Sequence, residues 1–333
     1  MTIRKIKIKD LSSDKRYKIQ EMKKILTATF ALAILALASV NLNGQTQRYF
    51  DERYISTHSF LNPVLFNVGA TAFHGEQELL VNYRNKWSTF DDAPKTITLG
   101  YDGVLIDRLG IGAMFLQDNF GSLKTSKGQL SLSYNIESEE NKISFGLATE
   151  YIQHGLNSVG SGNEIFDFND PLYKIKSEGA TFLDVSFGVY GKYLETFTYG
   201  ISLPSLISSR LDDGGDNPRD LGFIVNLGYQ VKSTSGISIE PSIIVKQLNR
   251  VPTHIDLNAK LGFLDDKFTS GVSYTLGADK RLGFLIGFAI DKLNFYYSYN
   301  TSMQEFQDYN NGSHELTAKL RIGQSKEMKK EME

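Results

Sequence analysis

The chain has 333 residues, a formal net charge of −2 and no cysteine, which excludes disulfides and thiol catalysis. Residues 1–44 carry nine Lys or Arg and three Asp or Glu, so the remainder holds 27 basic and 35 acidic residues. Because that remainder has no basic excess, we expect no nucleic-acid partner.

The N-terminus reads as an export signal. A basic start at Met22-Lys23-Lys24 precedes the apolar run Ile25–Val40, and small residues offer a cut after Ala38 or Gly44. We therefore expect residues 1–44 to be an N-terminal extension and signal peptide, with Met22 as the true start. A signal anchor with a basic cytoplasmic tail is the alternative, although the run is short for a transmembrane helix.

Residues 45–77 are polar and aromatic and predict a periplasmic lead-in. Residues 78–323 follow as about fourteen strand-like runs, and residues 324–333 form a charged tail. The predicted strands are 78–87, 95–103, 109–117, 127–136, 142–153, 179–190, 194–203, 219–231, 235–247, 254–264, 267–277, 281–290, 292–300 and 313–322. An even strand count is typical of bacterial single-chain barrels.

These runs alternate between apolar and polar residues with the period of two that a strand requires. In the run 181–190, Leu183, Val185 and Phe187 share one face, and Asp184 lies on the other. Repeated behind an export signal, this pattern predicts an all-β protein, a transmembrane antiparallel up-and-down β-barrel with lipid outside and a polar lumen. A soluble β-sandwich is the structural alternative.

The predicted inward face carries charges of both signs: Glu150, Asp184, Glu240, Lys246, Asp256, Lys260, Lys319 and Arg321. Mixed signs favour a lumen crossed by salt bridges over a wide pore of one sign. Glycines at positions 146, 188, 228 and 287 lie within strands, where they relieve curvature or allow close packing against a lumen plug.

The connections alternate in length. Even-numbered connections such as 138–141, 191–193 and 291–292 are short, whereas odd-numbered ones such as 154–178 and 204–219 are long. This alternation is expected when periplasmic turns are short and extracellular loops are long. The eleventh connection, 278–280, is short and departs from the trend.

Aromatic residues lie near the strand ends and are candidates for the girdles at the headgroup level of a membrane. The candidates are Tyr151, Tyr190, Phe295, Tyr296, Tyr297 and Tyr299. Ordinary β-propensity explains any single one of them as well.

An ordered set of motifs lies between Phe60 and Gly121. It comprises Asn62, Pro63, Tyr83, Arg84, Asn85, Trp87, Ala93, Pro94, Asp102, Gly103, Asp118 and Gly121. With the closing strand at His314-Glu315-Leu316, this set resembles the PorP/SprF family of type IX secretion system membrane proteins. Lys86 stands where the family usually has Gln, and Val64 where it prefers Ala. The resemblance covers essentially all of the mature chain.

The resemblance implies an outer-membrane protein of a Gram-negative, Bacteroidota-type bacterium that acts in export or surface attachment of secreted proteins. The implied partners are secreted proteins with a type IX C-terminal domain, periplasmic and outer-membrane components of the machinery, and outer-membrane lipid. Some family members serve gliding motility. The resemblance implies no reaction and no cofactor. A passive porin or small-molecule transporter and an outer-membrane enzyme are the alternatives.

The residues themselves add three expectations. Arg84 and Lys86 share one face of the first strand and should face the lumen, because two cations are costly against lipid. Trp87 is either an interfacial anchor or a partner-docking residue. The five histidines form no ligand spacing, and the acidic stretch 212–217 reads as a solvated turn rather than a calcium loop, so we expect neither a metal nor a catalytic site.

Overall fold

The computed structural model describes residues 52–90, 92–156, 179–207, 209–211, 221–233, 235–248, 252–277, 280–303 and 310–322. The predictions for residues 1–44, for the acidic turn at 212–217 and for the charged tail at 324–333 fall outside these ranges. None of the helices in the described ranges has the length and apolar character to cross a bilayer.

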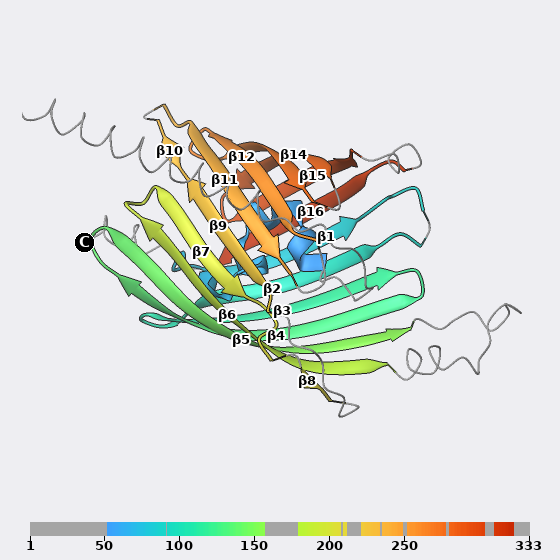
Figure 1. Ribbon diagram of the computed structural model, residues 1–333. Helices are drawn as coiled ribbons and strands as arrows, with labels where there is room; N and C mark the ends of the chain where they lie inside the picture. The colour runs from blue at the N-terminus through green and yellow to red at the C-terminus, as the bar shows by residue number, and fades with distance from the viewer. Residues whose placement is uncertain are drawn as a thin grey trace, which may run out of the picture. The chain divides into compact units, whose positions relative to one another are not determined.

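Fourteen antiparallel strands build the wall of a barrel in the described chain (Figure 1). They are β1 (Gln77–Asn85), β2 (Lys95–Ile106), β3 (Leu109–Phe120), β4 (Leu123–Glu137), β5 (Asn141–Leu156), β6 (Ala180–Tyr193), β7 (Phe197–Leu203), β9 (Phe223–Tyr229), β11 (Ser238–Gln247), β12 (His254–Phe263), β13 (Phe268–Leu276), β14 (Arg281–Ile290), β15 (Leu293–Ser302) and β16 (Ser313–Ile322). Two short strands, β8 (Ser209–Arg210) and β10 (Val231–Lys232), pair with β6 and β11. The barrel closes through β1 with β16 and through β9 with β11. The predicted fold is confirmed.

The wall is apolar outside and polar inside. Leu130 and Leu132 on β4 are 62% and 52% exposed, whereas Ser131 and Ser133 between them are 3% and 2% exposed. A soluble protein would bury the leucines and expose the serines. Exposed apolar rows on every side of a closed sheet require lipid as the outer solvent.

The two ends of the barrel differ. At one, the short-turn end, the strands are joined by residues 107–108, 138–140, 194–196, 264–267 and 291–292. At the other, the long-loop end, the connections include residues 86–94, 157–179, 204–222 and 303–312. β3 and β4 are also joined at the long-loop end, but by a tight turn at Gly121, where φ is 55°. That the long-loop end is extracellular stays a prediction.

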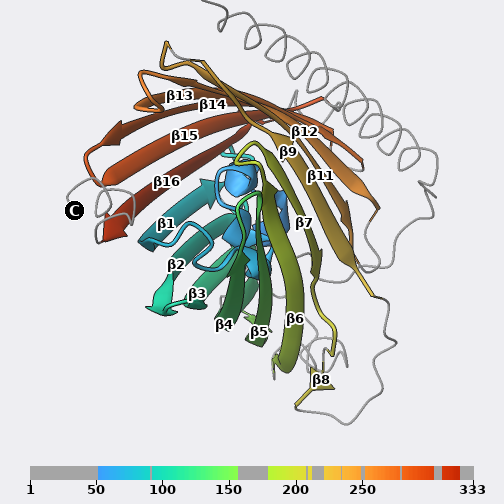
Figure 2. The same ribbon diagram turned by 90° about the vertical axis from the view of Figure 1, so that its left-hand side faces the viewer.

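Residues 52–75 lie inside the barrel and are here called the N-terminal plug (Figure 2). The plug contains four 3-10 turns, η1 (Glu52–Ile55), η2 (Thr57–Phe60), η3 (Pro63–Leu65) and η4 (Val68–Ala70). Tyr54 and Phe66 pack against the wall residues Ile224 and Ile244, all four nearly fully buried. The sequence did not predict that the expected lead-in lies within the lumen.

The structure places some of the aromatic girdle candidates on the outer face and others in the lumen. Tyr151 is 50% exposed and Phe295 is 36% exposed, both on the outer face. Tyr190 is instead 7% exposed, with its ring 4.9 Å from the Phe73 ring of the plug. Tyr296 faces inward as well, with its ring 6.4 Å from that of His58. Both side chains follow the alternation of their strands, because the even-numbered residues of β6 and β15 face the lumen.

Candidate functional site

A buried ionic cluster ties the start of the plug to β4, β5 and β6. Arg53 Nη2 lies 3.0 Å from Glu150 Oε2, and Lys127 Nζ lies 2.8 Å from the same oxygen. Ser186 Oγ donates to the other carboxylate oxygen over 2.9 Å. Arg53 also donates to Gln129. One wall carboxylate therefore balances two cations, of which the plug supplies one.

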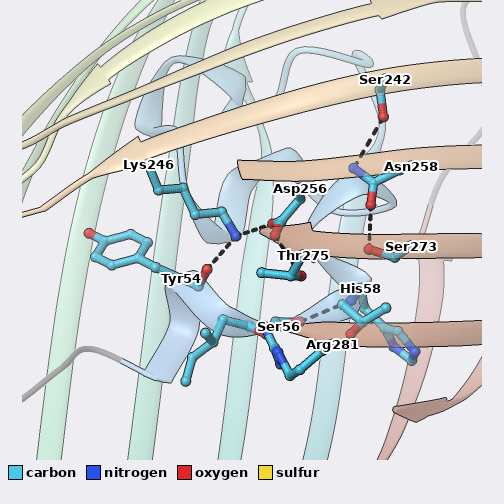
Figure 3. Close-up of polar contacts among 12 residues, drawn as sticks. Tyr54, Ser56, His58, Ser242, Lys246, Asp256, Asn258, Ser273, Thr275 and Arg281 are labelled. Atoms are coloured by element: carbon cyan, nitrogen blue, oxygen red, sulfur yellow. Dashed lines mark hydrogen bonds and ion pairs between the residues drawn. The ribbon is translucent and has the colours of Figure 1, made fainter. Parts of the chain in front are cut away.

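A second cluster holds the plug against β11, β12 and β14 (Figure 3). Lys246 donates to the backbone carbonyl of Tyr54 and forms an ion pair with Asp256. Thr275 Oγ1 donates to Asp256 over 2.8 Å, and Arg281 Nη1 donates to the carbonyl of Ile55 over 3.2 Å. The backbone carbonyls of η1 thus accept from cationic side chains of the wall.

Glu315 on β16 binds the first turn of η2. Its carboxylate accepts from the Thr57 backbone N–H over 3.0 Å and from Ser56 Oγ, and Asn82 Nδ2 on β1 donates to it over 2.7 Å. A carboxylate that accepts free N–H groups at the start of a turn is a capping arrangement. Glu315 is fully buried, so this cap fixes η2 to the closing seam of the barrel.

Glycines of β5 and β6 bring the wall into contact with the backbone of η4. A Cβ at Gly146 would lie 2.2 Å from the Val68 carbonyl oxygen, and one at Gly188 would lie 2.1 Å from Asn67 Oδ1. Asn67 Nδ2 in turn donates to the Val189 carbonyl over 2.9 Å. No side chain fits at these two positions, so the plug and the wall fit each other closely.

The end of the plug is fixed near the short-turn end by motif residues. The Ala72 N–H donates to Asp102 on β2 over 2.7 Å, and Thr71 Oγ1 lies 3.1 Å from Ser131 Oγ on β4. Pro63 begins η3, as its fixed φ permits. The preceding Asn62 is 2% exposed.

Another group of motif residues forms a structured rim at the long-loop end. The Trp87 N–H donates to Ser313 Oγ over 3.3 Å, and the Lys86 N–H donates to the Pro94 carbonyl over 3.0 Å. The Trp87 ring lies edge-on to Phe120 at 6.1 Å, with Lys86 Nζ 4.7 Å above it. The loop between β1 and β2 is thereby held against its neighbours.

The structure thus divides the sequence motif between two places. Asn62, Pro63 and Asp102 belong to the plug and its contacts near the short-turn end, and Gly103 follows Asp102 on β2. The residues at or next to the long-loop rim are Tyr83, Arg84, Asn85, Trp87, Ala93, Pro94, Asp118 and Gly121. Arg84 and Lys86 are 3% and 7% exposed and face the lumen as predicted, whereas Tyr83 faces outward.

Sequence reasoning missed the plug anchors Arg53, Tyr54 and Glu315. Arg53 and Tyr54 lie in a segment without strand alternation, and the partners of Arg53 and Glu315 are 97 and 258 residues away along the chain. The inward charges on Glu150, Lys246 and Asp256 were the available signal, because buried charges need partners.

A cavity of about 1240 Å³ lies between the plug and the short-turn end. Its walls carry both signs of charge, including the ion pairs Lys319–Glu78 at 2.7 Å and Lys260–Glu240 at 2.6 Å beside it. The predicted cross-linking of the interior is therefore confirmed. Within the described ranges, no three His, Asp or Glu side chains group as metal ligands would.

Several solved structures resemble the barrel at low sequence identity. Omp33 of Acinetobacter baumannii has 7% identity over 74% of this chain and 98% of its own, with a TM-score of 0.47. The toluene transporter TbuX of Ralstonia pickettii has 8% identity over 84% and 96%, with a TM-score of 0.48. A FadL homologue of Pseudomonas aeruginosa has 12% identity over 77% and 93%, with a TM-score of 0.44. Similarity at this level carries no argument about function.

No curated protein matches the sequence. A family model described as type IX secretion system membrane protein PorP/SprF matches residues 47–320, which include the plug and nearly all of the barrel. The chain therefore belongs to the PorP/SprF family of type IX secretion system membrane proteins and is a β-barrel of the outer membrane.

Proposed function

We propose that this barrel acts in the export or surface attachment of secreted proteins as a docking platform and not as a conduit. The observation that carries the proposal is the plug, because packed protein across the lumen blocks the passage of a polypeptide. Glu150, Lys246 and Glu315 of the wall hold the plug from different sides of the barrel through buried charged groups. Each of these contacts is a hydrogen bond to a buried charged group, and breaking one costs about 1.5–3 kcal/mol.

Under this proposal, the long-loop rim contacts the C-terminal domain of a secreted protein. Phe90 and Phe120 are 41% and 47% exposed beside Trp87, and the loop that carries Phe90 is hydrogen-bonded to two neighbouring connections. Rigid exposed aromatic side chains are typical anchors in protein interfaces. The short turns at the other end would then contact periplasmic components of the machinery.

A passive porin or small-molecule transporter is the alternative function, and the plug disfavours it. Liposome swelling separates the two. Purified barrel in liposomes should admit small sugars no faster than protein-free liposomes, whereas a porin would give swelling that depends on solute size.

The docking role is tested by replacing Trp87 and Phe120 with alanine in the native bacterium. We expect the barrel to assemble in the outer membrane and the amount of surface-exposed cargo to fall several-fold, as measured by surface proteomics. The matched control replaces Phe288 and Phe295, a ring pair on the outer face whose centroids are 5.3 Å apart near the short-turn end. Normal cargo display by the Trp87 and Phe120 variant would refute the assignment of the rim.

A further inference from the structure

The outer face of the barrel carries two lysines at its long-loop end. In the fourteen wall strands of the described chain, only Lys95 on β2 and Lys124 on β4 place a charged side chain on an outward position. Their direction follows from the strand alternation, because Thr96 and Thr125 beside them are each 3% exposed and face the lumen. Every other charged residue of these strands lies on a lumen position.

The two lysines flank an asparagine in one row across three neighbouring strands. Lys95 is the register partner of Asn119 on β3, and Asn119 is the register partner of Lys124. Neighbouring strands lie about 4.7–4.9 Å apart, so the backbones of the two lysines are about 9.5 Å apart. Two long side chains that start at this separation can both reach a group that lies over Asn119. The row thus offers two ammonium groups and one amide to a single ligand.

This row lies at the border of the apolar wall. On the side toward the middle of the barrel, Ile97, Leu99 and Phe115 point outward and are 43%, 45% and 43% exposed. On the side toward the loops lie the rings of Trp87 and Phe120. Tryptophan is enriched where hydrocarbon meets the lipid headgroups, and a charge that is costly at the bilayer centre is tolerated there. The lysines are therefore placed at the level of the headgroups.

The outward charges of the wall are of one sign, unlike the mixed charges of the lumen. No outward position of the described wall strands carries Asp or Glu, and Lys124 forms no ion pair with any residue of the described chain. Asp92, three residues before Lys95, has an exposed side chain in the loop, so water screens its attraction to the lysines.

We propose that Lys95, Asn119 and Lys124 bind the phosphate group of a membrane lipid in the leaflet at the long-loop end. A phosphate accepts charge-assisted hydrogen bonds from ammonium groups and a further one from an amide N–H. Basic residues at the edge of the hydrocarbon are a recurrent way in which membrane proteins bind anionic headgroups.

A lipid fits this surface better than a soluble anion, because the apolar residues Ile97, Leu99 and Phe115 continue directly from the row toward the middle of the wall. Acyl chains attached to the phosphate would lie against these side chains, so one ligand satisfies the cations and the apolar surface together. The inference does not depend on the docking role of the rim, since it concerns the lipid-facing wall and needs no secreted protein.

The test measures lipid binding to the detergent-purified full-length barrel by native mass spectrometry. Dioleoyl phosphatidic acid should bind more tightly than dioleoyl phosphatidylcholine, whose phosphate carries a compensating cation. The variant K95Q/K124Q should bind phosphatidic acid about tenfold more weakly or worse, since each hydrogen bond to a charged group is worth about a factor of ten or more. K95R/K124R should bind it as the wild type does, because arginine also binds phosphate.

The matched control is K267Q/K292Q, which removes two exposed lysines from turns at the short-turn end. It has the same net charge as K95Q/K124Q and should bind phosphatidic acid as the wild type does. Equal binding of the two lipids by the wild type, or an equal loss of binding in both glutamine variants, overturns the proposal.

Two water-soluble probes distinguish the lipid from other sources of negative charge. Isothermal titration should detect no binding of inorganic phosphate or of acetylated hexaglutamate amide that depends on Lys95 and Lys124. Binding of inorganic phosphate as tight as that of phosphatidic acid would assign the site to a free anion. Binding of hexaglutamate in its place would assign the site to an acidic protein segment. Either result refutes a lipid site.

A second measurement separates lipid binding from a role in the fold. K95Q/K124Q should unfold at the same temperature as the wild type in detergent without lipid, because both side chains lie on the outer face. Added phosphatidic acid should raise the unfolding temperature of the wild type but not that of this variant, since a ligand stabilises only the folded state that binds it. A lower unfolding temperature of the variant without lipid would show that the lysines merely support the fold.

Discussion

Gly146 and Gly188 show how single residues fit the plug to the wall. The backbone of η4 occupies the space that a side chain would fill at Gly146, and Asn67 does so at Gly188. Gly228 is different, since its Cβ would meet only ordinary contacts at 3.5 Å or more, and Gly287 is crowded by Tyr296 of the wall itself. Of the two explanations open for strand glycines, close packing against a plug holds for the first pair.

Replacing Gly146 with valine should displace the plug. The new Cβ would collide with backbone atoms of Val68, which cannot rotate away, so overpacking of about 3 kcal/mol or more is expected. Trypsin should then cleave at Arg53 in folded barrels in which the wild type resists. Gly128→Val is the matched control, because no atom lies within 4 Å of a Cβ there. Equal resistance of Gly146→Val and wild type would contradict the close fit.

Glu150→Gln should destabilise the barrel by about 3–5 kcal/mol, because Arg53 and Lys127 would both lose the buried carboxylate charge that they contact. Urea unfolding in detergent micelles measures this change. Glu195→Gln makes the same chemical change on an exposed side chain and should cost about 1 kcal/mol or less. Comparable losses in the two variants would argue against the ionic anchor.

The plug is the element that the sequence pattern hides. Its four turns contain only three or four residues each, too short for a helical period, and it carries no strand alternation. Its contacts are made to strands far along the chain, so no local signal reveals them. The wall strands, in contrast, can be recognised in the sequence because apolar and polar residues alternate over seven to sixteen residues.

A disulfide between plug and wall tests whether the plug must move. Thr71→Cys and Ser131→Cys should form a disulfide under oxidation, because their hydroxyl oxygens lie 3.1 Å apart and the chain has no other cysteine. If the barrel is a docking platform, cargo display should persist with the plug locked. The reduced double variant and each single cysteine variant are the controls. Loss of display only in the oxidised form would mean that the plug opens during export.

At the scale of the whole molecule, the barrel reverses the usual distribution of polarity. The outward row contains exposed leucine, valine, isoleucine and phenylalanine on strand after strand, while Asp184, Lys246 and Glu315 are almost fully buried. Lipid outside the barrel makes the exposed apolar residues favourable, and charge pairing inside the lumen makes the buried charges favourable.

Two exposed leucines should therefore respond differently to replacement by arginine. Leu132→Arg places a charge in the middle of the outward row of β4 and should cost about 2–4 kcal/mol. Leu264→Arg changes a residue that is 71% exposed at a turn of the short-turn end and should cost at most about 1 kcal/mol. Folding titrations into liposomes compare them. Similar costs would indicate that β4 is not surrounded by lipid.

Strand number, strand faces and membrane residence followed from the sequence, because a period of two is a local property that survives in every run. The same alternation places Tyr190 and Val189 on opposite faces of their strand, with Tyr190 on the face of Asp184. The prediction that Tyr190 belongs to a girdle therefore overlooked a signal in the sequence. Only the tertiary structure decided that residues 52–75 lie inside the barrel and that Arg53 meets Glu150. Such facts depend on which strands become neighbours when the sheet closes, and closure joins residues that are distant along the chain.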